Sequence, residues 1–424
     1  MPVIHTWGSR LALHVCLFMP LSLLAAAAPP VDPLADPPVP AFMGQTQAPA
    51  PAAVSKVQQQ VIASGFESPR SLVALPDGVL LVAEGEGRVR ILSAEGQLSE
   101  PLAGMPELLS VGGRGIGDFV LDADFANNRR VFFSYLAPAP GQKAGPRSAE
   151  DRNRALERGE PFQLERLASA RLSEDFTRLE NVQTIAEVWG RRLLSAPDGT
   201  LYVSTMAFDL AIREQRPLAQ NIKSPRGKVL RFNADGSIPA DNPFVNRPGV
   251  EPALYTVGHR DPDGLALHPL TGDVWEIEHG PMGGDEVNRL TPGANYGWPL
   301  VTYGKNYDGS RIGYSSLYGI EEPRYYWYPS VAPSGLLFYT GSLFPDWQGN
   351  LFLGTMSPTQ GKFLVRLVLD DTKVVAEEHL LADNDRRIRA LAQGADGALY
   401  VLTDSENDPD GGRQFAGEVI RLTP

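Results

Sequence analysis

The feature that most constrains the fold is a repeated local pattern, in which two short β-rich runs meet at an Asp-Gly or similar tight turn. The clearest copy spans residues 71–83 around Pro76-Asp77-Gly78, and a turn at Gly85 and Gly87 leads into another β-rich run at 88–92. Short apolar runs separated by turn residues are typical of antiparallel strands joined by hairpins. The first copy therefore predicts three successive antiparallel strands.

The same pattern occurs at five further places along the chain. These hairpins span residues 122–135, 195–203, 268–277, 343–354 and 394–401. Six units of short strands, without helical periods between them, predict an all-β fold, a six-bladed β-propeller in which radial repetition leaves few exposed sheet edges. Ring closure requires residues 57–63 and 417–422 to share a blade. Because the copies are unevenly spaced, a large β-sandwich or two smaller all-β domains are the alternatives.

The first residues are typical of an export signal. Arg10 precedes a mostly apolar run that ends in small residues suited to cleavage, so residues 1–28 are predicted to be a signal peptide, with an uncleaved anchor as the alternative. No later stretch is apolar over the roughly 20 residues that a spanning helix requires. We therefore expect a periplasmic or secreted protein with no membrane span in the mature chain.

Two segments have the composition of connectors. Residues 29–56 are dominated by Pro and Ala and predict an extended, solvated tether, so that the propeller occupies residues 57–424. Residues 139–161 are rich in charge and contain Gly141 and Pro146. This second segment predicts an excursion from the domain surface.

Charge and cysteine content narrow the possible partners. The chain has 50 acidic and 38 basic side chains, a formal net charge of -12, which is the wrong sign for a protein that binds phosphate backbones. No nucleic-acid partner is expected. The single cysteine, Cys16, lies within the predicted signal peptide, so the mature protein would contain no disulfide.

Eight segments resemble, in order, the landmarks of a known family. They are residues 66–72, 227–236, 258–266, 278–286, 295–299, 303–307, 332–335 and 387–389. The most specific is the run from Glu278 to Glu286, followed ten residues later by Tyr296. On these segments the chain resembles the soluble PQQ-dependent aldose (glucose/sorbosone) dehydrogenases. The resemblance implies a six-bladed propeller that oxidises an aldose sugar at C1 to the lactone and passes the electrons to an external acceptor, which the sequence does not identify.

The resemblance also implies the residues of the site. The backbone carbonyls of Gly280 and Pro281 would bind a calcium ion beside the cofactor, and Glu286 and Tyr296 would serve a second, structural calcium; calcium prefers such oxygen ligands. Guanidinium groups suit PQQ because they pair bidentately with carboxylates, of which PQQ has three. The residues implied to bind the cofactor are Arg260, Asp261, Tyr307, Ser330, Arg387 and Arg389.

Several positions depart from the family pattern. The histidine that accepts the sugar proton in this family is replaced by Val188, and valine can neither accept nor release a proton. Asp261 and Asp263 stand where Asn and Gln are expected, and Ser357 replaces a lysine. One hypothesis is that Asp261 or Asp263 acts as the general base, which requires a carboxylate within about 3 Å of the sugar hydroxyl.

These replacements leave other functions open. Two additional carboxylates disfavour a trianion in a low-dielectric pocket unless they are paired, and Arg114 and Arg191 are available as partners. One alternative is a degenerate propeller that binds calcium and a ligand or partner without redox chemistry. Another is a calcium-dependent lactonase, in which the metal activates water.

Overall fold

Six antiparallel sheets, each containing one of the predicted hairpins, make up the unit Pro33–Pro424 of this computed structural model. The structure describes residues 38–208, 214–404, 406–407 and 414–424. The predicted signal peptide, residues 1–28, and the first part of the predicted tether, residues 29–37, lie outside the described residues. Within the described residues, no helix is long and apolar enough to cross a membrane.

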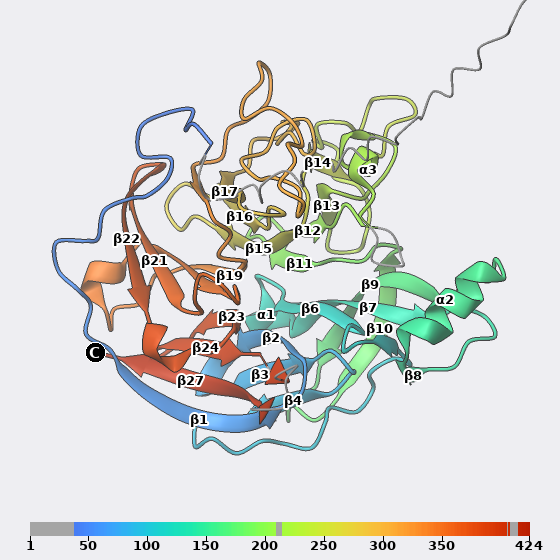
Figure 1. The fold of residues 1–424 in the computed structure, drawn as a ribbon. Helices are drawn as coiled ribbons and strands as arrows, with labels where there is room; N and C mark the ends of the chain where they lie inside the picture. The colour runs from blue at the N-terminus through green and yellow to red at the C-terminus, as the bar shows by residue number, and fades with distance from the viewer. Residues whose placement is uncertain (1–37, 209–213, 405, 408–413) are drawn as a thin grey trace, which may run out of the picture. The chain divides into compact units, whose positions relative to one another are not determined.

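One edge strand of each sheet lies at the centre of the fold (Figure 1). These inner strands are β2 (Pro69–Ala74), β6 (Ile116–Leu121), β11 (Arg192–Ser195), β15 (Pro262–Leu267), β19 (Pro333–Phe338) and β23 (Ile388–Gln393). Each of them contacts two others in the order β2, β6, β11, β15, β19, β23 and back to β2. This closed order confirms the six-bladed β-propeller.

The remaining strands extend each blade outward by antiparallel pairing. The middle strands are β3 (Leu80–Glu84), β7 (Arg130–Pro138), β9 (Gln163–Leu172), β12 (Thr200–Thr205), β13 (Lys228–Asn233), β16 (Val274–Glu278), β17 (Asp285–Arg289), β20 (Leu351–Thr355), β21 (Leu364–Asp370), β24 (Leu399–Thr403) and β27 (Gly417–Thr423). The outermost strands are β1 (Gln58–Phe66), β4 (Val89–Leu92), β10 (Leu179–Ala186), β14 (Leu254–Val257), β18 (Tyr325–Trp327) and β22 (Lys373–Leu380). The β2 blade has three strands, and the others have four.

The predicted turns form because their aspartates bond the backbone that follows them. Asp198 accepts a hydrogen bond from the Thr200 amide at 3.0 Å, and Gly199 adopts a φ of 81° that favours glycine. Asp396 makes the same contact with the Ala398 amide at 3.0 Å. These turn residues therefore fix the point at which the chain leaves an inner strand and enters the next strand of the blade.

The first and last strands of the described chain close the ring. Strand β1 pairs with β27 from Gln58↔Thr423 to Phe66↔Gly417, and β27 also pairs with β24 of the same sheet. This is the closure predicted from residues 57–63 and 417–422. One blade therefore contains strands from both ends of the propeller.

Helices and minor strands lie in the connections between the strands of the blades. The helices are α1 (Phe125–Asn128), α2 (Ala149–Glu157) and α3 (Arg216–Gln220), with 3-10 turns at Pro76–Gly78, Pro345–Trp347 and Ala382–Asn384. The minor strands are β5 (Leu109–Val111), β8 (Gly145–Arg147), β25 (Glu406–Asn407) and β26 (Gln414–Phe415). The predicted excursion at 139–161 has internal structure: β8 pairs with β5 in parallel, and Ser148 forms a capping box with Asp151 at the start of α2.

The described part of the predicted tether, residues 38–56, is not simply solvated as we expected. Gln45 is fully buried and donates to the Pro323 carbonyl at 2.9 Å, while its own carbonyl accepts from the Tyr326 amide on β18. Ser55 donates from its hydroxyl to Glu378 on β22 at 2.8 Å. The physical reason is that outer strands present unpaired backbone and polar groups, which this segment covers.

We predict that closure of the ring contributes strongly to stability. Leu422 on β27 is fully buried, so Leu422→Ala is expected to lower the free energy of unfolding by about 2–5 kcal/mol, through lost burial and a residual cavity. Val61 on β1 is 53% exposed, and Val61→Ala should change it by less than about 0.5 kcal/mol. Urea denaturation measures both; equal effects would contradict a closure held by the β27 side chains.

Candidate active site at the propeller axis

A single guanidinium links the inner strands across the axis. Arg192, at the start of β11, is 6% exposed, and its side chain contacts residues from all five other blades. Its partners are Asp263 Oδ1 at 2.9 Å, the Arg70 carbonyl at 3.1 Å, Ser334 Oγ at 3.0 Å, the Arg389 carbonyl at 2.9 Å and Asp118 Oδ1 at 3.7 Å. The network holds the ends of the inner strands in fixed positions relative to one another.

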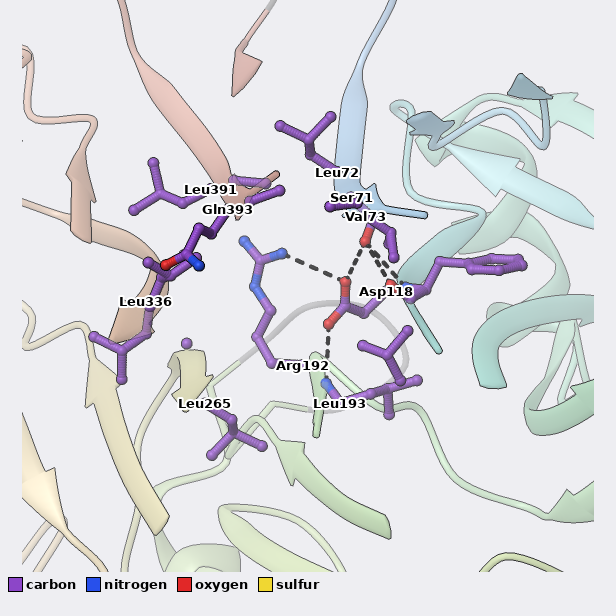
Figure 2. Close-up of a pocket in the computed structure, with 18 of the residues that line it drawn as sticks. Ser71, Leu72, Val73, Asp118, Arg192, Leu193, Leu265, Leu336, Leu391 and Gln393 are labelled. Atoms are coloured by element: carbon purple, nitrogen blue, oxygen red, sulfur yellow. Dashed lines mark hydrogen bonds and ion pairs between the residues drawn. The ribbon is translucent and has the colours of Figure 1, made fainter. Parts of the chain in front are cut away.

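Arg192 and Asp118 also line a cavity of about 490 Å³ on the axis (Figure 2). Ser71 donates to Asp118 at 2.7 Å, and the Leu193 amide donates to the other carboxylate oxygen at 2.9 Å. Leucine side chains and strand backbone make up much of the remaining wall. Burial raises the pKa of Asp118, although Arg192 and Ser71 oppose that shift.

Asp263 on β15 is held by three arginines. Its carboxylate lies 2.9 Å from Arg191, 2.9 Å from Arg192 and 3.7 Å from Arg389, and the side chain is almost fully buried. Burial alone raises the pKa of Asp263, but the surrounding guanidiniums outweigh it and hold the pKa below its ordinary value. A carboxylate stabilised in this way is a weak proton acceptor. The hypothesis that Asp263 is the general base is therefore not supported by its surroundings.

Asp261 has a different environment. Its Oδ1 lies 3.6 Å from Arg191 Nε and has no hydrogen-bond partner among the described residues. Fewer charges compete for this carboxylate than for Asp263. Of the two candidate bases, Asp261 is the one with a buried carboxylate oxygen that has no hydrogen-bond partner among the described residues.

A second pocket lies beside Arg191, the residue that contacts both Asp261 and Asp263. It is lined by Arg70, Ile116, Gly117, Leu136, Gln163, Glu165, Trp189, Met206, Arg226, Arg114 and Arg191. We call it the mouth pocket. Arg226 pairs with Glu165 at 2.7 Å, whereas neither Arg70 nor Arg114 forms an ion pair within the described part of the chain. Burial, and then neighbouring arginines, lower the pKa of both Arg70 and Arg114.

The three arginines predicted to bind the cofactor have different surroundings. Arg260 is buried; its Nε lies 3.0 Å from Glu214, and its Nη1 donates to the Gly280 carbonyl at 3.1 Å. Arg389 donates to Asp404 at 2.6 Å, and Arg387 lies 3.9 Å from the same carboxylate. Arg387 and Arg389 thus both approach Asp404 at the start of β23.

The predicted calcium loop is organised by Asp285. This buried carboxylate accepts hydrogen bonds from the Gly280 amide at 2.8 Å, the Ala332 amide at 2.7 Å and Ser330 Oγ at 2.8 Å. Burial raises its pKa, against these hydrogen bonds and the nearby His279. The loop also requires glycine at position 284, where φ is 74° and a Cβ would lie 2.3 Å from the Gly304 amide nitrogen. Ser330 is thereby engaged with the loop.

A small cavity brings together three of the four predicted calcium residues. Gly280, Glu286 and Tyr296 line it with Glu278, and its volume of about 10 Å³ has room for about one water or ion. Burial, then the charge of Glu278, raise the pKa of Glu286 well above its ordinary value. The Tyr296 hydroxyl is engaged elsewhere, since it donates to the Arg289 carbonyl at 2.7 Å. Two facing carboxylates in so small a space suit a cation.

Several other residues named in the sequence analysis do not line this small cavity. Tyr307 is 71% exposed, so the structure does not place it among the buried arginines. Pro281 is not among the residues that line the small cavity. Val188 is buried in an apolar cluster with Phe132 and Leu193, and Ser357 is buried, with its hydroxyl accepting from the Gln360 amide at 3.2 Å.

The sequence analysis missed Arg70, Arg192 and Asp404. Arg70 and Arg192 are charged residues at the second position of β2 and the first position of β11, just before the predicted hairpins at 71–83 and 195–203. Such a residue at the axial end of a strand is a recognisable signal, because an isolated charge there needs partners from other blades. Asp404 follows β24 directly, and only the fold brings it to Arg389.

Fold and site together define a β-propeller with a charged, partly open site at its axis. The chain belongs to the glucose/sorbosone dehydrogenase family, whose profile matches residues 66–411. It is 34% identical over 387 residues to the aldose sugar dehydrogenase YliI of Escherichia coli strain K12, covering 88% of this chain and 94% of that protein.

Two further proteins place the chain within this family. The crystal structure of the soluble aldose sugar dehydrogenase from Escherichia coli in the apo-form is 33% identical, with a TM-score of 0.74 over 87% of this chain and 100% of that one. Quinoprotein glucose dehydrogenase B of Acinetobacter calcoaceticus is 25% identical, covering 82% of this chain and 85% of that protein.

We predict that Asp263 is required mainly for stability. Asp263→Asn leaves the guanidiniums of Arg191 and Arg192 without their shared anion and should lower the free energy of unfolding by about 3–5 kcal/mol. The matched control is Asp396→Asn, which removes a surface pair with Arg421 and should cost less than about 1 kcal/mol. Equal losses in chemical denaturation would show that the axial cluster contributes little.

The same residue makes stability depend on pH. Because the folded pKa of Asp263 is below its unfolded value, its contribution is complete above about pH 5 and is lost as pH falls through the range below about pH 4. The free energy of unfolding of Asp263→Asn should therefore vary less steeply than that of the wild type between about pH 5 and pH 2. Parallel curves for the two proteins would refute the lowered pKa.

Proposed function

We propose that the chain oxidises an aldose sugar at C1 to the lactone, with PQQ as the redox group and an external electron acceptor. Membership of the family supports sugar oxidation in general, and the name of the Acinetobacter relative identifies that protein as a quinoprotein. Export through a signal peptide at residues 1–28, to the periplasm or beyond, is part of the same proposal. It is supported by the apolar run after Arg10.

The observation that carries the proposal is the unbalanced positive charge of the mouth pocket. Arg70 and Arg114 are buried beside other guanidiniums and form no ion pair among the residues that the structure describes. Arg70 instead donates to the Gly113 carbonyl at 2.8 Å. Like charges in a buried site repel one another, so an anion would relieve an existing cost. In charge, these donors therefore suit a ligand that carries carboxylates.

In this proposal each group has a separate task. Arg70, Arg114 and Arg389 would hold the carboxylates of PQQ, which would supply the two-electron acceptor. The side chains of Leu136, Trp189 and Met206 form the apolar wall of the mouth pocket and exclude water from the reacting atoms. Calcium would bind at the loop of Gly280 and Pro281, with a second ion at Glu286 and Tyr296.

Asp261 is proposed to accept the proton of the sugar hydroxyl. Its carboxylate stands beside Arg191 without the triple clamp that holds Asp263. Arg191 lies between the two carboxylates and orients both. This assignment replaces the family histidine, whose position is occupied by Val188.

A second candidate is a propeller that binds an anion without redox chemistry. Two observations favour it: Val188 packs in an apolar cluster, and the mouth pocket encloses about 30 Å³, room for only a few waters unless it opens. In this case Arg70 and Arg114 would bind a smaller carboxylate or phosphate ligand. Sugar oxidation would then be absent at any PQQ concentration.

We predict that the purified chain, supplied with PQQ and calcium, reduces an artificial dye in the presence of aldoses. Asp261→Asn should lower kcat by about 100-fold or more while PQQ binding, followed by quinone absorbance, stays within about twofold. The control Glu187→Gln changes an exposed side chain next to Val188 and should be silent. PQQ binding without turnover, or no binding, would reject the proposal in favour of the second candidate.

A further inference from the structure

Lys228, the first residue of β13, has a fully buried side chain that the site described above does not use. Its Nζ donates hydrogen bonds to the carbonyls of Leu218 at 2.7 Å, Ala219 at 2.9 Å and Arg226 at 2.6 Å. An ammonium group has three protons, so each proton has one acceptor. All three acceptors belong to residues 214–227, which contain α3 and which we call the rim segment (Figure 1).

The backbone of Lys228 is held firmly, whereas the rim segment is not. Lys228 pairs in register with Thr205 of β12 and Val257 of β14, and its amide donates to Thr205 Oγ1 at 3.1 Å. Among residues 214–226, only Ala219 is buried. A segment with so little apolar burial depends on polar contacts for its position.

The rim segment carries two charged side chains into the site. Glu214 lies 3.0 Å from the Nε of Arg260, which is one of the arginines predicted to bind the cofactor. Arg226 pairs with Glu165 at 2.7 Å, and both line the mouth pocket. The position of the segment therefore determines how these two pairs are presented to a ligand.

Two backbone amides connect the rim segment with the chain that leads into β15. The Gly258 amide donates to the Ala219 carbonyl and the His259 amide to the Gly227 carbonyl, each at 3.1 Å. The Ala219 carbonyl is also one of the three acceptors of Lys228. A displacement of the rim segment must therefore break contacts directly beside the predicted cofactor arginine.

We propose that Lys228 is a positioning residue of the candidate active site, because its three hydrogen bonds fix the rim segment. Glu214 and Arg226 of that segment in turn hold Arg260 and one wall of the mouth pocket. Lys228 belongs to residues 227–236, a landmark segment for which the resemblance implied no role in the site. The proposal applies to any ligand of the site, so it does not depend on the proposed sugar oxidation.

The charge of Lys228 has no counter-ion, since no carboxylate of the described residues forms an ion pair with it. Burial lowers the pKa of Lys228 to about 7. The titratable and charged side chains on the elements packed against it are Tyr202 of β12, Tyr255 of β14, Glu214, Arg216, Lys223 and Arg226 of the rim segment, and His259 and Arg260 of the neighbouring chain. None of these side chains is a cause of that lowered pKa.

Opening of the rim segment should therefore be coupled to proton uptake. In water, the pKa of a lysine returns to about 10.4. Between about pH 7 and pH 10, Lys228 is neutral in the closed form and charged in the open form, so opening takes up a proton and becomes rarer as pH rises. Well below about pH 7, Lys228 is charged in both forms, and opening no longer depends on pH.

Amide hydrogen exchange tests the proposal on the full chain without a ligand. Protection factors of the rim segment and of residues 258–259 are measured from pH 5.5 to pH 8.5, each relative to the unstructured chain at the same pH. In the wild type they should rise by about 10- to 20-fold between pH 7 and pH 8.5 and change by less than about twofold below pH 6.5.

The variant Lys228→Met keeps the length of the side chain and removes its donors. Because three carbonyls then lose their partner, protection at pH 7 should fall by about tenfold or more in the rim segment and at residues 258–259 together. The pH dependence should disappear. Lys223→Met is the matched control, since Lys223 is exposed on the same segment, and it should behave like the wild type.

Strand β21, in another blade, is the internal reference, and its protection should stay the same in both variants. A merely structural role of Lys228 would instead lower protection throughout Lys228→Met and give no pH dependence in the wild type. That result overturns the proposal, as does equal protection of the rim segment in the wild type and Lys228→Met. If Lys228→Met does not fold, the pH profile of the wild type decides by itself.

Discussion

The charge at the centre of the propeller is the constraint on which the rest of the structure depends. Neighbouring blades pack through apolar side chains, as Leu81 and Phe133 do, and apolar attraction has no preferred direction. Arg192 adds direction, because its planar fork of donors can meet a carboxylate, a hydroxyl and backbone carbonyls from different blades at once. Lysine has neither the shape nor the number of fixed donors. The positions of Arg70, Asp263 and Arg389, and through them the site, follow from this contact.

The same network limits the chemistry. Asp263 stabilises the axis because it stays ionised among guanidiniums, and for that reason it is a poor base. Arg191 contacts both Asp261 and Asp263. Asp263 is also held by Arg192 and Arg389, so its carboxylate is the more constrained of the two. The mouth pocket is the reverse case, where Arg70 and Arg114 keep a charge that the protein itself leaves unbalanced. Stability and ligand binding thus use neighbouring residues of the same strand ends for different purposes.

Local features were predictable from the sequence, and contacts across the fold were not. The Asp-Gly turns at Gly199 and Gly397 located the hairpins, because those turns depend on residues a few positions apart. The role of Arg192 depends on five other blades, and no spacing in the sequence shows it. Residues 38–56 were predicted to be part of an extended, solvated tether, but β18 and β22 supply partners for them that composition cannot reveal.

The pairing of β1 with β27 has a consequence for how the protein is made. The contacts between these strands join residues separated by almost the whole described chain. Contacts of such long sequence separation are slow to form, because the loop they close is costly in entropy. Until β27 has been synthesised, β1 and β24 each have an open edge, and open edges invite pairing with other chains. The yield of folded protein should therefore depend on how well the edge of β1 is protected from other chains until β27 has been synthesised.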